Sequence, residues 1–522
     1  MSSIRSFRIR CLNGRRCDFS ASLVALACAF SALAGATGSP APPALFPQSV
    51  ANALRAGALP TDAIGIAVLH ARTGEVTLDV EATQPRQPAS TLKTLTSIVA
   101  LDTARPDARF GTQWLADGAL DGDRLAGHLY LRGKGNPDFD AQQLEQSMRA
   151  LRVAGVRRIA GDIVLDRSFY RPHNEYLLAP AFDETPEFRY NVVPDALMLG
   201  SNLLRLTLAS DARGVTVAAS PALDDVEVVP RFALNAKRCA DWEDDWQYPE
   251  VAHKGGRIVV ALRGGFPRDC TVVTEINVLD RSDYAARLLA STWRRLGGEW
   301  AGRVREGETP PGARVLAEQR SRTLAELTRD INKRSDNPIT RMVFLNVAAR
   351  DDGTGTLRAT AAQSSALVQR WLDARQIARD GLFMENGSGL SRRERISPLT
   401  LARTLVAAQA SPWFAEFLST FPIVGVDGAM RQRLADTPVA QQGRIKTGSL
   451  RDVASVAGYV SDARGERYVV VAMINHPEAS GKRARPVLDA VLDWVGRTDL
   501  ASWRRNQSAR GGEWRGEPDA GR

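Results

Sequence analysis

Cysteine and histidine are scarce in this sequence, and their scarcity excludes several kinds of site. The 522 residues include 5 cysteines and 5 histidines, and the histidines are scattered without a His-Glu-x-x-His motif. No metal site is therefore predicted, and no cofactor either. Gly-x-Ser-x-Gly is missing, which removes support for an α/β-hydrolase nucleophile. The Gly-rich segment at 133–137 lacks the Gly-Lys-Ser/Thr end of a phosphate-binding loop.

The middle of the chain, residues 37–500, carries little of the net positive charge. The net charge is +9, but residues 1–36 contribute +4 and residues 501–522 contribute +2, which leaves +3 for the middle. So small an excess predicts no nucleic-acid partner. With 44% hydrophobic and 24% charged residues, the composition is that of a globular protein and excludes collagen-like, wholly disordered and multi-span membrane chains.

The N-terminus has the pattern of a secretory signal peptide. Five arginines precede an apolar run from Phe19 to Ala36, which ends in the small residues Ala34-Gly35-Ala36. This pattern predicts export, with residues 1–36 as the signal peptide. The alternative is an uncleaved membrane anchor, for which the 18-residue run is barely long enough. Peripheral contact with a membrane stays open.

Most of the cysteines belong to this leader. Cys11, Cys17 and Cys28 precede the expected cleavage point, so the exported chain keeps only Cys239 and Cys270. Two cysteines in an exported chain predict a disulfide between them. The alternative is a pair of unbonded, buried thiols.

The order of predicted elements indicates one discontinuous domain that is split by a large insertion. A short apolar strand at 64–69 precedes a helix from Ser90, and helices return from Ser321 before two strands and a last helix near the end. Between them, short β-like runs separated by Gly, Pro, Asn and Asp favour antiparallel sheet. The predicted domain comprises residues 48–114 and 306–498, the β-rich insertion of two small domains spans 115–305, and residues 501–522 form a disordered tail.

The first motif with a chemical meaning is Ser90-Thr91-Leu92-Lys93, the only Ser-x-x-Lys in the chain. Residues three apart lie on one face of a helix, so Lys93 is expected one turn from the Ser90 hydroxyl. A serine becomes a strong nucleophile when a base takes its proton, and a lysine can be that base when burial or cationic neighbours lower its pKa. The alternative is that Ser90 is only a helix N-cap.

Two further triplets are equally ambiguous when each is taken alone. Ser335-Asp336-Asn337 precedes a proline, and all three residue types also suit a helix-capping turn. Lys446-Thr447-Gly448, followed by Ser449, precedes a predicted strand pair, and its alternative is a basic strand end. The three motifs in this order form the signature of the penicillin-recognising serine enzymes, which the chain therefore resembles.

The spacing of the motifs indicates which of these enzymes the chain resembles. Ser335 follows Ser90 by 245 residues and Lys446 follows Ser335 by 111. In class A β-lactamases the second motif follows much sooner, and their Glu-x-x-Leu-Asn segment is absent here. The chain instead resembles, over about 48–498, the D-alanyl-D-alanine carboxypeptidase/endopeptidase family, the low-molecular-mass class C penicillin-binding proteins. Segments 161–166 and 386–392 share this resemblance, with departures from the family pattern at 133–137 and Asn386.

This resemblance implies a fold and a set of site residues. The fold is α+β, a β-lactamase/transpeptidase-like antiparallel sheet of five strands flanked by helices, with a large two-lobed insertion. Ser90 attacks the D-Ala carbonyl, Lys93 is its base, and backbone N–H groups of Ser90 and Ser449 hold the oxyanion. The implied catalytic residues are Ser90, Lys93, Ser335, Asn337 and Lys446, and the implied substrate-binding residues are Thr447, Gly448 and Ser449.

The resemblance also implies a substrate and a compartment. The substrate is a peptidoglycan stem peptide that ends in D-Ala-D-Ala, or the cross-bridge between D-Ala and diaminopimelate, and β-lactam antibiotics are covalent inhibitors. Because that polymer lies outside the inner membrane, the periplasm is the expected location. Asp162 or Asp166 is a candidate for reading the diaminopimelate side chain. A β-lactamase on the same scaffold and a non-catalytic peptidoglycan-binding homologue stay open as alternatives, and the oligomeric state is not predicted.

Overall fold

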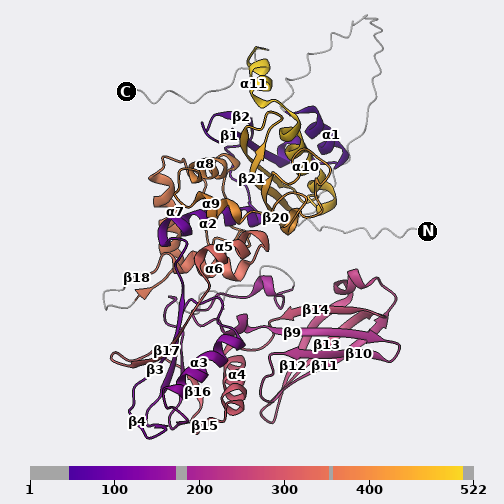
Figure 1. The fold of residues 1–522 in the computed structure, drawn as a ribbon. Helices are drawn as coiled ribbons and strands as arrows, with labels where there is room; N and C mark the ends of the chain where they lie inside the picture. Colours follow the sequence, from indigo (N-terminus) through magenta and orange to yellow (C-terminus); the bar gives the residue numbers. More distant parts are fainter. Residues whose placement is uncertain (1–45, 172–184, 352–356, 510–522) are drawn as a thin grey trace, which may run out of the picture. The chain divides into compact units, whose positions relative to one another are not determined.

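The computed structural model of this chain describes residues 46–171, 185–351 and 357–509 (Figure 1). The predicted signal peptide at 1–36 lies outside these residues. Within the described ranges, no helix combines the length and the apolar character that crossing a membrane requires.

A five-stranded antiparallel sheet is built from the two ends of the described chain. Its order is β2-β1-β22-β21-β20, so the first strands pair with the last ones, and Ile66 of β1 lies opposite Ala472 of β22. The predicted α+β fold, with a helix-flanked antiparallel sheet, is confirmed. The strands are β1 (Ile64–His70), β2 (Val76–Val80), β20 (Arg444–Leu450), β21 (Val453–Ser461) and β22 (Arg467–Asn475).

Helices cover both faces of this sheet because its central strands are apolar on both sides (Figure 1). Successive side chains of a strand point to opposite faces. Ala67 and Leu69 therefore join one core, while Ile66 and Val68 join another. The first core contains residues of α2 (Lys93–Ala104), α5 (Leu324–Lys333), α6 (Asn337–Asn346), α7 (Ala361–Asp373), α8 (Pro398–Ala408) and α9 (Phe414–Ser419), and the second those of α1 (Gln48–Ala56) and α10 (Gly481–Arg497).

The first part of the insertion is a five-stranded sheet of order β16-β8-β6-β3-β17, with a small sheet of order β15-β7-β5-β4 and two helices. Trp114, only 1% exposed, packs into the core of this part. The sheet includes β3 and β17 and thus extends beyond the predicted limits of 115–305 on both sides. The elements are β3 (Gly111–Ala116), β4 (Leu120–Asp121), β5 (Arg124–Leu125), β6 (Leu129–Lys134), β7 (Arg158–Ile159), β8 (Ile163–Asp166), β15 (Glu299–Trp300), β16 (Val304–Glu306), β17 (Arg314–Arg320), α3 (Ala141–Val153) and α4 (Arg281–Arg295).

The prediction of antiparallel sheet throughout the insertion is wrong for several strand pairs. β6 pairs with β8 in parallel, and β8 pairs with β16 in parallel. Two parallel strands need a long crossover connection. Helix α3 lies in the chain between β6 and β8 and forms part of that crossover. The runs at 129–131 and 163–165 were identifiable as strands, but their relative direction depends on this helix.

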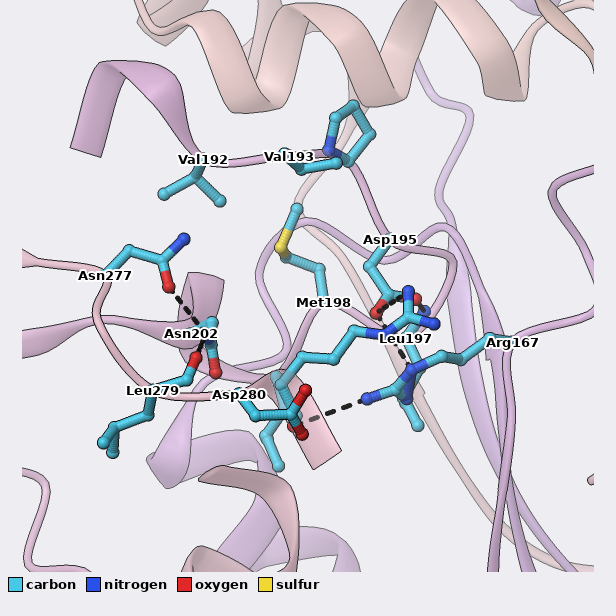
Figure 2. Close-up of a pocket in the computed structure, with 13 residues that line it drawn as sticks. Arg167, Val192, Val193, Asp195, Leu197, Met198, Asn202, Asn277, Leu279 and Asp280 are labelled. Carbon is cyan, nitrogen blue, oxygen red and sulfur yellow. Dashed lines mark hydrogen bonds and ion pairs between the residues drawn. The ribbon is translucent and has the colours of Figure 1, made fainter. Parts of the chain in front are cut away.

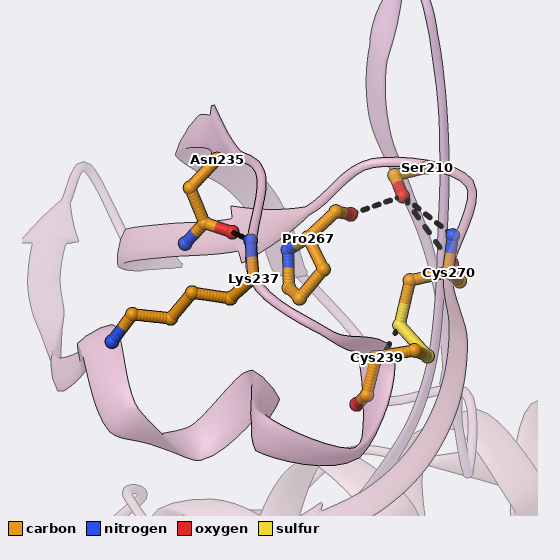
Figure 3. Close-up of a disulfide and its surroundings, with 6 residues drawn as sticks. All are labelled: Ser210, Asn235, Lys237, Cys239, Pro267 and Cys270. Carbon is orange, nitrogen blue, oxygen red and sulfur yellow. Dashed lines mark hydrogen bonds between the residues drawn. A yellow bond between two sulfur atoms is a disulfide. The ribbon is translucent and has the colours of Figure 1, made fainter.

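The second part of the insertion consists of two three-stranded sheets of order β10-β9-β14 and β11-β13-β12. Cys239 and Cys270 are joined there by a disulfide with an S–S distance of 1.99 Å, and Ser210 Oγ accepts a hydrogen bond from the Cys270 N–H at 3.0 Å (Figure 3). The bond ties the 3-10 helix Cys239–Asp245 to the segment just before β14. The strands are β9 (Leu204–Asp211), β10 (Gly214–Ser220), β11 (Val226–Asn235), β12 (Trp246–Lys254), β13 (Arg257–Pro267) and β14 (Thr271–Ile276).

The predicted disordered tail begins with a helix. Helix α11 spans Leu500–Ala509, whereas the rest of the tail lies outside the described residues. Leu500 is fully buried, and the Trp503 ring lies edge-on to Trp494 of α10 with the ring centroids 5.2 Å apart. The composition favours disorder because the segment has many arginines and few apolar residues. The burial of Leu500 and the contact of Trp503 with Trp494 instead pack the start of this segment against the folded chain. A two-stranded ladder, β18 (Arg350–Asp351) with β19 (Leu357–Arg358), completes the described elements.

We expect the disulfide to stabilise the second part of the insertion. Closing a loop between cysteines 31 residues apart lowers the conformational entropy of the unfolded chain. In the chain-entropy treatment this stabilises the folded state by about 3–4 kcal/mol. The double variant C239A/C270A should therefore unfold at a lower urea concentration under non-reducing conditions. Tryptophan fluorescence follows the transition, since two of the ten tryptophans, Trp242 and Trp246, lie in this region with their ring centroids 5.5 Å apart. An unchanged midpoint would contradict the expectation.

Candidate active site

The first predicted pair, Ser90 and Lys93, lies at the start of α2. Ala89–Leu92 form a 3-10 turn, and α2 follows from Lys93 with every residue buried through Leu101. The Lys93 Nζ lies 2.8 Å from the Ser90 Oγ, within hydrogen-bonding distance. Ser90 is half-buried and reaches solvent, whereas Lys93 is fully buried behind it. The alternative in which Ser90 only caps the helix has no support, because no side-chain cap bond forms at this helix start.

Lys93 has two further hydrogen-bond partners besides Ser90. Its Nζ lies 2.6 Å from the Asn337 Oδ1 and 2.5 Å from the Ser388 carbonyl oxygen. Burial lowers the Lys93 pKa to about 7, although the charges of Glu394 and Asp336 raise it. A lysine with a pKa near neutrality is unprotonated often enough at physiological pH to accept the proton of a neighbouring hydroxyl.

The second pair joins Ser335 to Lys446. The Lys446 Nζ donates to the Ser335 Oγ at 3.0 Å and to the Thr447 carbonyl oxygen at 2.8 Å. Lys446 is fully buried, and burial together with the positive charge of Lys93 holds its pKa well below the usual value. The structure thus brings all five predicted catalytic residues into one group of two hydrogen-bonded sets, in which Asn337 contacts the first lysine and Ser335 the second.

The Ser335-Asp336-Asn337 triplet is both a helix cap and part of this group. The Asp336 side chain accepts the Ile339 N–H at 2.8 Å, which is N-capping of α6, and Pro338 occupies the first turn. Ser335 has a φ of +60°, in the left-handed region that costs a non-glycine residue about 1–3 kcal/mol. This turn directs the Ser335 and Asn337 side chains toward the two lysines. Asp336 meanwhile accepts a backbone N–H group at the start of α6.

The Lys446–Ser449 segment belongs to β20, an edge strand of the main sheet. Gly448 passes close to the nucleophile: a Cβ at this position would lie 2.9 Å from the Ser90 N and 2.8 Å from the Pro88 carbonyl oxygen. Only glycine lets the strand approach this closely. Thr447 is half-buried and Ser449 is exposed, so both side chains border the open side of the group.

The loop at 385–391 and residue Glu394 complete the group, and sequence reasoning missed their part in it. The sequence of segment 386–392 shows only a family resemblance. Ser388 contributes a carbonyl oxygen rather than its side chain, and Glu394 binds backbone N–H groups. Neither kind of contact leaves a pattern of residue types, so no signal in the sequence would have identified them.

The insertion contacts the group through helix α6. Arg189 Nη2 lies 3.0 Å from the Asp336 Oδ2, and the Tyr190 carbonyl accepts a hydrogen bond from the Asn337 Nδ2 at 3.0 Å. Further along α6, Arg341 donates to the Val192 carbonyl at 3.0 Å and Asn346 to the Gly135 carbonyl at 2.8 Å. Gly135 belongs to the Gly-rich segment 133–137, which therefore has a structural contact with α6.

The two aspartates considered for diaminopimelate already have local partners. Asp162 pairs with Arg305 at 2.8 Å, and the buried Asp166 accepts hydrogen bonds from Thr309, at 2.8 Å from the backbone N–H and 2.6 Å from the hydroxyl. Their role in substrate recognition stays a prediction. Among the described residues, no group of three or more His, Cys, Asp or Glu side chains is arranged to hold a metal ion.

A cavity of about 200 Å³ lies within the insertion (Figure 2). Apolar side chains such as Met198 and Leu279 form part of its wall. At its polar end, Arg167 Nε lies 3.0 Å from the Asp195 Oδ2. None of the predicted catalytic residues lines it.

Two serine–lysine pairs, one asparagine and a helix-flanked antiparallel sheet together define the class of penicillin-recognising serine enzymes. Within that class, residues 46–495 match the D-Ala-D-Ala carboxypeptidase 3 (S13) family, and the chain belongs to this family. The resemblance inferred from the motifs is thereby confirmed, and the chain is a serine-type D-Ala-D-Ala carboxypeptidase, a hydrolase.

Individual relatives agree with this assignment over most of their length. The chain is 28% identical over 418 residues to D-alanyl-D-alanine carboxypeptidase DacB of Haemophilus influenzae, covering 79% of this chain and 85% of that protein. It is 26% identical over 444 residues to D-alanyl-D-alanine carboxypeptidase of an Actinomadura species, covering 82% and 80%. The crystal structure of penicillin binding protein 4 from Haemophilus influenzae is similar with a TM-score of 0.70 at 25% identity, covering 88% of this chain and 98% of that chain. That protein has also been solved in complex with a β-lactam.

We expect the substitution G448A to disrupt the site without unfolding the chain. The added Cβ would approach the Ser90 N and the Pro88 carbonyl oxygen to within 3.0 Å, so β20 must move away from the nucleophile. A displacement of about 1 Å in such a site costs about 100-fold in rate. Acylation by a fluorescent penicillin measures the effect. G481A is the matched control, because a Cβ there meets only the Arg485 Nη2, at 3.6 Å; equal rates in both variants would contradict the packing argument.

Proposed function

We propose that this chain is an exported serine D-Ala-D-Ala carboxypeptidase and D,D-endopeptidase that cleaves peptidoglycan stem peptides through an acyl-enzyme on Ser90. The observation that carries the proposal is the 2.8 Å contact between the Ser90 Oγ and the buried amine of Lys93. Family membership over residues 46–495 supports the substrate class.

In the acylation step, the Ser90 Oγ attacks the carbonyl carbon of the penultimate D-Ala while Lys93 Nζ accepts the hydroxyl proton. The carbonyl oxygen becomes an oxyanion, which the backbone N–H groups of Ser90 and Ser449 stabilise. The closeness of Gly448 to the Ser90 N supports this pairing, since it brings β20 beside the nucleophile.

In the second half of acylation, the C–N bond to the leaving D-Ala breaks and its nitrogen takes up a proton. The Ser335 hydroxyl gives this proton and regains one from Lys446, whose Nζ lies 3.0 Å away. An ester on Ser90 and a free D-Ala amine result. Lys446 recovers a proton in place of the one that Lys93 took from Ser90, which leaves Lys93 neutral again. Water then attacks the ester carbonyl while Lys93 accepts one of its protons, and this proton passes to the Ser90 Oγ as the ester C–O bond breaks. The shortened peptide leaves as the acid and the Ser90 hydroxyl is restored.

Substrate binding uses the solvent-facing side of the group. Thr447 and Ser449 bind the terminal carboxylate beside Lys446, and the bound carboxylate favours the protonated form of that buried amine. Asn337 holds the acyl-side amide of the substrate. Its Nδ2 carries two hydrogens, of which one is directed to the Tyr190 carbonyl, and the second donates to the substrate.

The same geometry accounts for β-lactam inhibition. A penicillin presents a reactive amide carbonyl next to a carboxylate, as the D-Ala-D-Ala end does, and its acyl-enzyme persists when water fails to release it. The β-lactam complex of the structurally similar Haemophilus influenzae protein is consistent with this proposal. Export is proposed from the N-terminal pattern, with the periplasm as the place of action because the peptidoglycan substrate lies there.

The proposal is tested by labelling with a fluorescent penicillin, followed by a denaturing gel, with the variant S90A beside the wild type. We expect a persistent labelled band in the wild type and none in S90A. Incubation with a pentapeptide muropeptide and with a cross-linked dimer then separates carboxypeptidase from endopeptidase products. Consumption of penicillin without a band would favour a β-lactamase, and muropeptide binding without product would favour a non-catalytic homologue.

We also expect acylation to depend on pH through Lys93. The base form of Lys93 is the unprotonated amine, and its pKa is lowered by burial to about 7. Below that pH the amine is protonated in a growing fraction of molecules, so the acylation rate should fall by about tenfold per pH unit. The second-order rate constant for penicillin acylation, measured from about pH 5 to about pH 9, gives the profile. A rate that stays constant down to the lowest pH would exclude Lys93 as the base.

A further inference from the structure

Glu394 is a buried carboxylate close to the reacting group, and the mechanism above gives it no task. Its exposed fraction is 0%, although it follows two arginines on a loop. Its Oε1 accepts the N–H groups of Glu385 at 3.2 Å, Asn386 at 2.9 Å and Gly387 at 2.8 Å, and its Oε2 accepts that of Gly389 at 2.8 Å.

These contacts indicate that Glu394 is ionised. A protonated carboxyl needs an acceptor for its hydrogen, whereas a carboxylate only accepts, and all four contacts are donated to Glu394. Burial raises the pKa of Glu394 above its usual value, and the four N–H groups oppose that rise by binding the anion. A buried charge with this many donors is compensated by the loop that surrounds it.

The carboxylate in turn determines the shape of that loop. Gly387 and Gly389 have φ values of +71° and +79°, a backbone form that favours glycine and that directs successive N–H groups toward one anion. Between them, Ser388 points its carbonyl oxygen at the Lys93 Nζ, at 2.5 Å. A Cβ on Gly389 would lie 1.7 Å from the Ala89 carbonyl oxygen, so the loop is pressed against the residue before the nucleophile.

We propose that Glu394 is a positioning residue for acylation: its carboxylate holds the loop at 385–389 so that the Ser388 carbonyl orients the amine of Lys93 toward Ser90. This inference rests on the proposed function. Glu394 is fully buried, and its hydrogen bonds go to the backbone of the loop, so it acts through the loop and through its charge.

The charge of Glu394 should affect the pKa of Lys93, and therefore the pH profile of acylation. A residue that only packed the loop would leave that profile unchanged. The charges acting on Lys93 are the carboxylates of Glu394 and Asp336, which raise its pKa, and the neighbouring amine of Lys446, whose own pKa is lowered by Lys93. Replacing Glu394 by a neutral residue leaves Asp336 and Lys446 in place. The protonated form of Lys93 loses one favourable charge, so its pKa falls and the acid limb of the rate profile moves to lower pH.

The test compares the variants E394Q and E394D with the wild type. E394Q keeps the size of the side chain but removes the charge, and its amide hydrogens oppose at least one of the four N–H donors. E394D keeps the charge and shortens the side chain. D462N is the matched control: Asp462 is also buried, at 4% exposed, and accepts the N–H groups of Arg464 and Glu466, at 2.8 and 3.0 Å, but it is not among the charges that act on Lys93.

Penicillin acylation is measured across pH for each variant, with thermal unfolding to establish that it is folded. We expect E394Q to acylate at least about 10-fold more slowly at neutral pH, as misplacement of a reacting group does. Its acid limb should move down by about one pH unit, as loss of a nearby opposite charge does. E394D should lose rate with its acid limb unmoved. D462N should keep both the rate and the limb of the wild type.

The outcomes separate this inference from the proposed function. A wild type that is not acylated would overturn the proposed function itself. An acylated wild type together with a folded E394Q of unchanged rate and limb would overturn only the role of Glu394. If E394Q does not fold, the test rests on E394D. Slower acylation with the acid limb of the pH profile unmoved supports the role of Glu394. Acylation at the wild-type rate, or a shifted acid limb, contradicts it.

Discussion

The site depends on the burial of one amine. Lys93 has no contact with water, so the free energy of hydrating its ammonium form is lost, and its pKa falls to about 7. The amine stays in place because three oxygens lie within hydrogen-bonding distance of it. The neutral amine donates to the Asn337 Oδ1 and the Ser388 carbonyl, and its lone pair faces the Ser90 hydroxyl. Each of these oxygens comes from a different part of the chain. The amine is shielded from water and hydrogen-bonded only when the fold has brought these three segments together. The lowered pKa of Lys93 therefore depends on the complete fold.

The scaffold meets this requirement by joining distant segments around α2. The main sheet pairs β1 with β22, which brings the C-terminal strands, and Lys446 with them, to the start of α2. Gly448 then allows β20 to lie against Ser90. The insertion holds α6 through Arg189 and the Tyr190 carbonyl, on the two residues that follow Ser335. The insertion therefore supports the second motif directly, in addition to any part it has in binding peptidoglycan.

The sequence allowed the reactive side chains to be predicted, because the chemistry requires particular residue types at fixed spacing. Ser90 and Lys93 are one turn apart on any helix, and Lys446 begins a recognisable triplet. Contacts made by the backbone could not be predicted. The Ser388 carbonyl and the N–H groups around Glu394 are backbone groups, which residues of any type can supply, so the sequence does not mark them. Strand partners were out of reach for a similar reason, since the parallel pairing of β6 with β8 depends on where α3 packs. Helix α11 was missed because it packs against Trp494, a residue outside the segment itself.

The central claim is that Lys93 is a neutral amine for much of its time at physiological pH, and NMR titration tests it most directly. The chain has only seven lysines, so labelling them with ¹³C at the ε-carbon gives a small set of signals. The variant K93R identifies the Lys93 signal by its absence. We predict that this signal titrates with a midpoint near pH 7, the pKa that burial gives the amine. A midpoint above about pH 9, close to that of a solvated lysine, would contradict the account, because Lys93 would then be protonated when acylation occurs.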